Sequence, residues 1–192
     1  MRPLRILIAD DESIRLLSLR AQLTALGYQV VAEATTGAEA VALARQTQPD
    51  LAILDIKMPG MDGIEAAEQI TQAQPIPIIL LTAYSESQLV ERAARANISA
   101  YLMKPVAEED LLPAIALALA RFSEFQALRQ EVVSLREALE ARKVIERAKG
   151  ILMRRLNLTE EEAFRRLQRQ SQDTNRKLAE VAQAIVLADQ ML

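Results

Sequence analysis

Three acidic side chains, one hydroxyl and one lysine stand at the ends of short apolar stretches of the sequence. Asp10 and Asp11 directly follow one such stretch, Asp55 ends another, and Thr82 and Lys104 end two more. Carboxylates that converge repel one another, and a hard divalent cation such as Mg²⁺ relieves that repulsion through oxygen ligands. A lysine ammonium can hold a phosphate oxygen as a point charge. The set therefore predicts that Asp55 accepts a phosphoryl group while metal and lysine neutralise the developing charge.

The prediction depends on the joint pattern, because each residue alone is weak evidence. An acid at a strand end is usually a cap or a solvated loop residue. Here the acids, the hydroxyl and the lysine end successive strands in the order that such a site needs. Lys104 also precedes Pro105, and a cis bond between them would aim the lysine, since cis peptides are largely a proline phenomenon.

The elements that must position these residues alternate along the first 120 residues or so. This alternation predicts an α/β domain with a parallel sheet covered on both faces and right-handed crossovers. The carboxyl ends of the strands, where open sheets of this class bind ligands, then bring the candidate residues together. We expect strands at 5–9, 28–34, 51–55, 78–82 and 99–103, and helices at 13–26, 37–48, 62–73, 85–96 and from about 108 onward.

Composition excludes several kinds of chemistry. The 192 residues contain no cysteine and no histidine, so disulfides, thiolate metal sites, cysteine nucleophiles and Ser-His-Asp catalysis are all excluded. Net charge is −3 but unevenly spread: residues 1–125 carry 10 basic and 16 acidic side chains, and residues 126–192 carry 13 and 10. The basic tail favours a polyanion partner, with solvated helix surface as the equal alternative.

The sequence also predicts a location. Residues 1–5 lead straight into a strand without a signal-peptide pattern, and we expect no apolar run that approaches the length of a membrane span. We therefore expect a cytoplasmic protein with no membrane partner.

From about residue 108 the pattern is helical almost to the end. An apolar row in steps of three and four predicts a coiled-coil-like connector of about two heptads, and we favour a dimer seam over one amphipathic helix packed on its own domain. Three helical segments should follow: 142–156, one capped by Thr159 with Glu162 in a capping box, and one beginning near Asp173 or Thr174. The apolar row consists of Phe125, Leu128, Val132, Leu135 and Leu139.

Residues 3–122 resemble the receiver domain of two-component response regulators. The resemblance is carried by Asp10-Asp11, Asp55, the run from Met58 to Gly63, Thr82-Ala83, Tyr101 and Lys104-Pro105. It implies a flavodoxin-like fold with strand order 2-1-3-4-5. It also implies autocatalytic phosphoryl transfer from a sensor histidine kinase to Asp55, with slow self-dephosphorylation and no other enzymatic activity.

The same resemblance implies roles for individual residues. Mg²⁺ would be held by Asp11, Asp55 and the backbone carbonyl of Lys57, with Asp10 assisting. Thr82 and Tyr101 would report phosphorylation by swinging inward. From the residues alone, packing on a half-buried strand is the better interpretation of Tyr101.

The tail, roughly residues 130–190, resembles the ANTAR domain, an RNA-binding output domain of transcription antitermination regulators. Ala148-Lys149-Gly150, Ala163-Phe164, Asn175 and Lys177-Leu178 carry the resemblance. It implies that phosphorylation favours a homodimer whose tails bind RNA hairpins in a leader transcript and prevent a terminator from forming.

The tail supplies candidate RNA contacts. Its cations can bind phosphates, and its polar side chains near residue 173 can bind base edges exposed in a loop. No aromatic stacking platform is evident, because the spacing of Phe164 with Ile151, Leu167 and Leu178 indicates core. The candidates are Lys149, Arg154, Arg155, Arg165, Arg166, Arg169, Gln172, Thr174, Asn175, Arg176 and Lys177.

We therefore divide the chain into a receiver domain (1–122), a helical linker (123–141) and an all-α three-helix domain (142–192). Three alternatives stay open at this point. The tail could bind DNA through a helix-turn-helix, although no short glycine-containing turn is evident. The acidic site could belong to an aspartyl-phosphate hydrolase, although such enzymes use an acid where this chain has Lys57. The first domain could also be a receiver-like scaffold that a ligand or partner controls.

Overall fold

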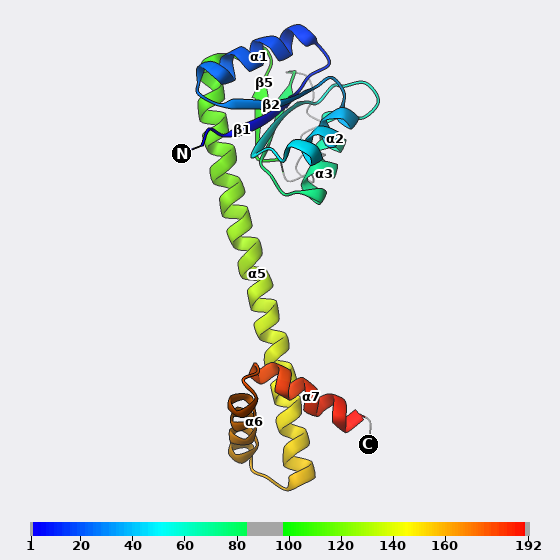
Figure 1. Ribbon diagram of the computed structural model, residues 1–192, viewed down its shortest axis with the longest axis vertical. Helices are drawn as coiled ribbons and strands as arrows, with labels where there is room; N and C mark the ends of the chain where they lie inside the picture. The colour runs from blue at the N-terminus through cyan, green and yellow to red at the C-terminus, as the bar shows by residue number, and fades with distance from the viewer. Residues whose placement is uncertain (1, 84–97, 191–192) are drawn as a thin grey trace. The chain divides into compact units, whose positions relative to one another are not determined.

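A computed structural model describes residues 2–83 and 98–190 of the chain (Figure 1). It contains two compact units, Met1–Gln126 and Ala127–Leu192, and the helix α5 (Glu108–Leu156) contributes to both. The finer division into receiver, linker and three-helix domain stays a prediction.

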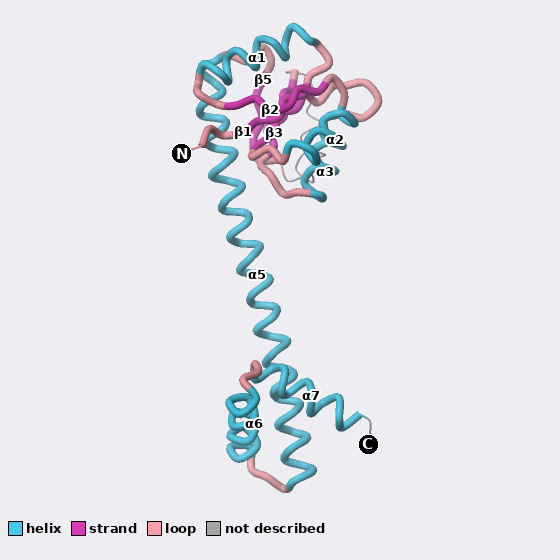
Figure 2. The backbone as a smooth tube through the Cα atoms, viewed as in Figure 1, coloured by secondary structure: helices cyan, strands magenta, loops and turns pink. Residues whose placement is uncertain are grey.

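The first unit is built on a five-stranded parallel sheet in the order β2-β1-β3-β4-β5, which confirms the predicted topology (Figure 2). Parallel pairing aligns Ala9 of β1 with Leu54 of β3, and Thr82 of β4 with Met103 of β5. The carboxyl ends of these strands therefore meet at one edge of the sheet. The strands are β1 (Arg5–Ala9), β2 (Gln29–Ala34), β3 (Leu51–Asp55), β4 (Ile78–Thr82) and β5 (Ala100–Met103).

Two buried layers cover the sheet because alternate side chains of each strand point to opposite faces. On one face, Leu7 and Leu54 pack with α2 (Gly37–Thr47) and α3 (Gly63–Ala73). On the other, Ile8 and Ile53 pack with α1 (Ser13–Ala25) and the start of α5. Figure 1 shows α2 and α3 together on their side of the strands. The central strands are buried on both sides, as their continuous apolar sequences predict.

The predicted elements of this unit match the described ones to within about two residues. The helix expected at 85–96 lies outside the described residues. The bond between Lys104 and Pro105 is cis, the isomer that we considered as a means of aiming the lysine.

Helix α5 is long and apolar enough to cross a membrane by length and composition alone. The sequence-based expectation that no apolar run approaches a membrane span was therefore too strict. One such helix is weak evidence for a span, because a core helix passes the same test. Leu111, Ala114, Ile115 and Ala118 of α5 are buried in the core of the first unit, which accounts for its apolar sequence.

The second unit is a three-helix arrangement of the end of α5, α6 (Glu160–Thr174) and α7 (Leu178–Gln190). The capping box of Thr159 and Glu162 is present, so α6 begins where the sequence predicts. The small core consists of Ala148, Ile151, Leu152, Ala163, Leu167, Val181, Ala182 and Val186.

Two predictions about this unit were wrong. The segment expected to start at 142 is not a separate helix, because α5 continues through the connector to Leu156. The third helix begins at Leu178, not near Asp173 or Thr174. Asn175 is left-handed, with φ 50°, and ends α6, while the Arg176 N–H donates to the Ser171 carbonyl at 3.1 Å. Such a bond closes a Schellman-type helix end. Asp173 and Thr174, which we predicted to begin the third helix, therefore belong to the C-terminal end of α6.

Candidate functional site

The carboxyl edge of the sheet brings together the predicted acids and lysine. The Lys104 ammonium lies 2.7 Å from a carboxylate oxygen of Asp10 and 2.7 Å from one of Asp55. Asp10 is 1% exposed and Asp55 4%. Three strands, β1, β3 and β5, thus each deliver one charged group to a single buried point. The arrangement places a cation against the side chain predicted to accept a phosphoryl group.

The third acid, Asp11, lies at the solvent side of this cluster. Oxygens of Asp10, Asp11 and Asp55 all lie within 4.8 Å of one another. Two oxygens bound to one Mg²⁺ at about 2.1 Å can be at most about 4.2 Å apart, so the three carboxylates lie close to the spacing that one ion needs. An all-oxygen donor set is the kind that Mg²⁺ prefers. The residues present therefore fit this metal.

Burial raises the pKa of Asp55 above its ordinary value of 3.8. Hydrogen bonding and charge attraction from Lys104 oppose this rise, repulsion from Asp10 adds to it, and a backbone hydrogen bond from Lys57 opposes it. Desolvation is the largest effect, because a carboxylate removed from water loses hydration that one shared lysine does not replace. A divalent cation at the site would favour the charged, nucleophilic form.

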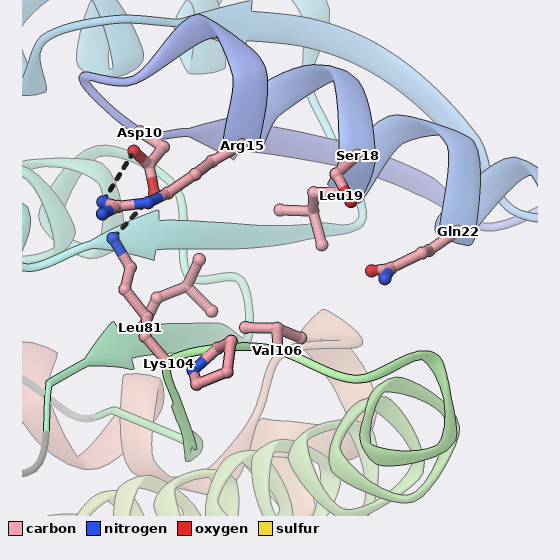
Figure 3. A pocket seen from close by; sticks show the side chains of 9 residues that line it. Asp10, Arg15, Ser18, Leu19, Gln22, Leu81, Lys104 and Val106 are labelled. Carbon is pink, nitrogen blue, oxygen red and sulfur yellow. Dashed lines mark hydrogen bonds and ion pairs between the residues drawn. The ribbon is translucent and has the colours of Figure 1, made fainter.

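Sequence reasoning missed Arg15 as a neighbour of the site. Its guanidinium lies 3.6 Å from Asp10 and 2.7 Å from Glu12. Figure 3 shows Arg15 and Lys104 both paired with Asp10, and the three residues help to line a small cavity of about 160 Å³. The sequence places Arg15 in the first turn of α1, five residues after Asp10, but the contact itself depends on how that turn leaves the strand.

Backbone packing behind Asp55 requires glycine at position 63. A Cβ built there would lie 2.0 Å from the Asp55 carbonyl oxygen, and the Gly63 N–H donates to the Ile56 carbonyl at 2.9 Å. The side chain of Asp62 caps α3 by accepting from the backbone N–H groups of Ile64 and Glu65. The Pro59–Gly63 turn therefore fixes the end of β3. Lys57 precedes this turn in the loop after β3 and is exposed.

The two predicted switch residues are not joined to the acids by hydrogen bonds among the described residues. The Thr82 hydroxyl donates to the carbonyl of Ala83 at 3.2 Å, and the Thr82 carbonyl accepts from the Lys104 N–H at 2.8 Å. Tyr101 is 39% exposed on β5. Partial burial raises the pKa of its hydroxyl. Their role as reporters of phosphorylation stays a prediction.

In the tail, Lys149, which we predicted to contact RNA, is already paired with two carboxylates of its own unit. Its ammonium lies 3.0 Å from Glu146 and 2.6 Å from Glu160, and the residue is 8% exposed. The hydrogen bonds that the ammonium donates to Glu160 and Glu146 raise its pKa, with Glu160 the larger cause. It also lies 6.0 Å from the ring centre of Phe164, which is half-buried and stands outside the apolar cluster. Lys149 therefore joins α5 to α6 and is less available to a phosphate than the exposed arginines.

The other ten candidate RNA contacts are all exposed, but they differ in their partners. Arg155, Arg165 and Arg176 pair with Asp189, Glu161 and Glu180. Within the part of the chain that the structure describes, four of the cations make no ion pair: Arg154, Arg166, Arg169 and Lys177.

Three of the arginines come together on α6. Arg165, Arg166 and Arg169 line a hollow of about 420 Å³. Gln172 and Thr174 stand in the last turns of α6 and Asn175 ends it, so these polar residues follow the arginines along the same helix.

Comparison with known proteins identifies both units. Residues 6–116 match the response regulator receiver domain, and residues 134–186 match the ANTAR domain. The chain belongs to the receiver–ANTAR response regulators. At the level of the family, this confirms the predicted phosphorylation-regulated response regulator with an RNA-binding antitermination output.

Relatives of this regulator differ in how much of it they share. The transcriptional regulatory protein PdtaR of Mycobacterium tuberculosis is 47% identical over 184 residues, which cover 96% of this chain and 90% of that protein. Protein PilH of Pseudomonas aeruginosa is 40% identical over 119 residues, 60% of this chain and 98% of its own. The first relative therefore shares both units, while the second matches only the length of the receiver.

Solved structures match the receiver unit. A CheY-like receiver domain from Methanospirillum hungatei has a TM-score of 0.59 and 34% identity, covering 64% of this chain and 98% of its own. A CheX–CheY complex with BeF₃ and Mg²⁺ from Borrelia burgdorferi has a TM-score of 0.56 and 28% identity, covering 59% and 87%. The first unit therefore has the receiver fold.

Proposed function

We propose that this regulator accepts a phosphoryl group on Asp55 from a sensor histidine kinase and that the modified protein binds RNA hairpins in a leader transcript to control antitermination. The observation that carries the proposal is the meeting of Asp10, Asp55 and Lys104 in a receiver that is continuous, through one helix, with an ANTAR unit. The receiver supplies the switch, and the ANTAR unit supplies the RNA-binding output.

The chemistry at Asp55 is a phosphoryl transfer. A carboxylate oxygen of Asp55 attacks the phosphorus of a phosphohistidine, the phosphorus–nitrogen bond breaks, and an acyl phosphate forms. Lys104, 2.7 Å from the acceptor, neutralises charge on the phosphoryl oxygens, and Thr82 stands at the neighbouring strand end. Mg²⁺, when bound, neutralises further charge on the phosphoryl group. Asp10, Asp11, Asp55 and the Lys57 carbonyl would hold it, and the related CheY of Borrelia burgdorferi was solved with Mg²⁺.

The regulator is proposed to act as a phosphoacceptor that slowly loses its phosphoryl group and to have no other enzymatic activity. A hydrolase with an aspartyl-phosphate intermediate needs an acid–base group beside the nucleophile. The residue two positions after Asp55 is Lys57, and no histidine exists in the chain. Multiple turnover of a small phosphate ester would contradict this proposal.

RNA binding is proposed to centre on the exposed cations of α6. Arg166 and Arg169 make no ion pair within the described part of the chain, and they line one hollow with Arg165. Cations of this kind supply the salt-dependent part of nucleic-acid affinity. Gln172, Thr174 and Asn175 at the end of the same helix can then donate to or accept from exposed bases.

Two further parts of the proposal follow from the family. Phosphorylation would favour a homodimer. The dimer would present two tails, and paired tails bind paired hairpins more strongly than single tails do. The regulator would work in the cytoplasm, where the leader transcript is made.

The test measures RNA hairpin binding by the full chain, with and without acetyl phosphate and Mg²⁺. We expect wild-type protein to gain the mass of one phosphoryl group and to bind hairpin RNA more tightly, while Asp55→Ala gains neither. Arg166→Ala with Arg169→Ala should lower the affinity at least about tenfold and reduce its salt dependence. Arg45→Ala, which removes an exposed charge from α2, is the matched control and should bind as wild type does.

The same measurement separates the alternatives. Tighter binding of duplex DNA than of hairpin RNA would support a DNA-binding output and contradict the proposal. Equal RNA binding with and without phosphorylation would leave the receiver as a scaffold that another partner controls.

A further inference from the structure

The buried carboxylate of Asp10 is held by two cations that come from different elements. One of its oxygens accepts a hydrogen bond from the Lys104 ammonium at 2.7 Å. The other lies 3.6 Å from the Arg15 guanidinium and accepts from the Glu12 backbone N–H at 3.0 Å. Figure 3 draws both cations beside this carboxylate. The phosphoryl transfer described above uses Lys104 and gives Arg15 no role.

The two cations differ in their other contacts. Lys104 also lies 2.7 Å from Asp55, and its side chain is 15% exposed. The Arg15 side chain is 45% exposed, and its guanidinium lies 2.7 Å from Glu12, an exposed acid. Lys104 is therefore tied to the phosphoryl acceptor, while Arg15 joins Asp10 to the solvent side of the site.

A phosphoryl group on Asp55 would compete with Asp10 for Lys104. An acyl phosphate carries about two negative charges at neutral pH, where the carboxylate carried one. A cation shared by two anions is attracted more strongly by the one with the larger charge. We therefore expect Lys104 to turn toward the phosphoryl oxygens. Asp10 is 1% exposed, so water cannot replace the lost contact, and a buried charge without a partner is costly.

Arg15 is placed to take over from Lys104 at Asp10. The present separation of 3.6 Å is an ion-pair distance, longer than the usual hydrogen bond of about 2.9 Å. Both cations line the cavity of about 160 Å³, so either side chain can move without displacing the core. A guanidinium presents several N–H donors in a planar fork, and it can bind Asp10 while it keeps Glu12.

The charge of Arg15 also bears on the metal. Asp10, Asp11 and Asp55, when ionised, form a cluster with Lys104 and Arg15 that carries one net negative charge. Mg²⁺ would turn this into one net positive charge, and the extra negative charge of a phosphoryl group would then make the cluster neutral. The charge of Glu12 is left out of this count, because water screens its exposed carboxylate.

We propose that Arg15 is a positioning residue of the acidic site, which holds Asp10 from α1 when Lys104 turns to the phosphoryl group. Its charge weakens the binding of Mg²⁺ alone and strengthens the binding of a phosphoryl group once Mg²⁺ is present. Arg15 acts through Asp10 and through its charge. The inference rests on the proposed function only in taking Asp55 as the phosphoryl acceptor.

Calorimetric titration of the full chain tests both effects without a phosphoryl donor. Mg²⁺ is titrated first, and beryllofluoride, which mimics a phosphoryl group on a carboxylate, is then titrated at saturating Mg²⁺ for each variant. We expect Arg15→Gln to bind Mg²⁺ about three- to tenfold more tightly and beryllofluoride at least about threefold more weakly than wild type. Damage to the fold would weaken both, so the opposite shifts identify a charge effect.

Two further variants serve as controls. Arg20→Gln removes another exposed cation from α1, one that pairs with Glu33 at 2.8 Å, and should bind both ligands within about twofold of wild type. Arg15→Lys keeps the charge and should lie closer to wild type than Arg15→Gln does in both titrations.

Three results would overturn the proposal. The first is wild-type affinity of Arg15→Gln for both ligands, and the second is a shift of both affinities in the same direction. The third is an Arg15→Lys variant that behaves as Arg15→Gln does, which would show that the charge is not the cause.

Failure of the proposed function would be seen separately. If acetyl phosphate adds no mass to wild-type protein that binds Mg²⁺ and beryllofluoride, the proposed phosphorylation fails while the effect of Arg15 stands. If wild-type protein binds Mg²⁺ but no beryllofluoride, Asp55 is not an acceptor, and the role of Arg15 toward the phosphoryl group is overturned with it. Loss of RNA binding changes neither titration.

Discussion

Lys104 is the side chain on which the acidic site depends. It is 15% exposed and contacts two carboxylates that are almost fully buried. Removing one partner from such a cluster leaves buried charge without compensation. We expect Lys104→Ala to lower the free energy of unfolding of the receiver by about 3 kcal/mol. Hydrogen exchange of amides in β1 and β3 measures this, and added Mg²⁺ should recover part of the loss.

The matched control for that prediction is Lys57→Ala, which removes an exposed lysine from the loop after β3, at the same edge of the sheet. It should change stability far less. A loss of stability for Lys104→Ala no larger than for the control would show that the lysine does not hold the buried acids together.

Asp55 should destabilise the fold at neutral pH in the absence of metal. Because burial raises its pKa, the folded state binds the proton more tightly than the unfolded chain does. Proton binding by Asp55 adds to the free energy of unfolding. This contribution is complete at pH values below the ordinary pKa of 3.8, and it is lost as pH rises through the folded-state pKa. Asp55→Asn should therefore be more stable than wild type at pH 7 without Mg²⁺, and the difference should shrink as pH falls toward 4.

Hydrogen exchange of β3 amides at the two pH values tests this sign. Glu65→Gln, an exposed acid in the first turn of α3, is the control for simple loss of charge. A wild-type protein more stable than Asp55→Asn at pH 7 would mean that Lys104 outweighs burial at this carboxylate.

At the scale of elements, two glycines should respond in opposite ways to alanine. Gly63 has the Asp55 carbonyl 2.0 Å from where a Cβ would lie, so Gly63→Ala must displace the end of β3. We expect a loss of about 1–3 kcal/mol and slower phosphorylation. Gly150 lies inside α5 with nothing within 4 Å, so Gly150→Ala should stabilise the second unit by about 0.5–1 kcal/mol. Hydrogen exchange in each unit gives both values.

The sheet and its acidic edge were predictable because local and tertiary signals agree there. Strand 51–55 is a continuous apolar run that ends in Asp55, and burial on both faces is what such a run predicts. The convergence of Asp10, Asp55 and Lys104 then follows from parallel pairing alone. Arg15 was missed because its contact with Asp10 depends on how the first turn of α1 leaves the strand.

The tail was harder to predict, since its helix ends depend on backbone geometry. Asp173 and Thr174 are residue types found at helix starts, but Asn175 adopts a left-handed conformation that ends α6. A helix start and a helix end at these residues both fit the sequence. The hydrogen bond from the Arg176 N–H to the Ser171 carbonyl decides for the helix end. The position of Lys149 likewise depends on Glu160, which lies across the turn on another helix.

At the scale of the whole molecule, one chain joins a phosphoryl-acceptor site to an RNA-binding unit through a single helix. The two functions need not communicate for the fold to be stable, because each unit has its own core. The central claim is therefore that phosphorylation of Asp55 changes what the tail binds.

The most direct measurement is the affinity of the full chain for hairpin RNA as a function of the fraction phosphorylated, with both read from the same samples. We expect the affinity to rise in proportion to the phosphorylated fraction and Asp55→Ala to stay at the unmodified level under the same acetyl phosphate and Mg²⁺. An RNA affinity that stays constant while the wild-type protein becomes fully phosphorylated would show that Asp55 does not control the tail.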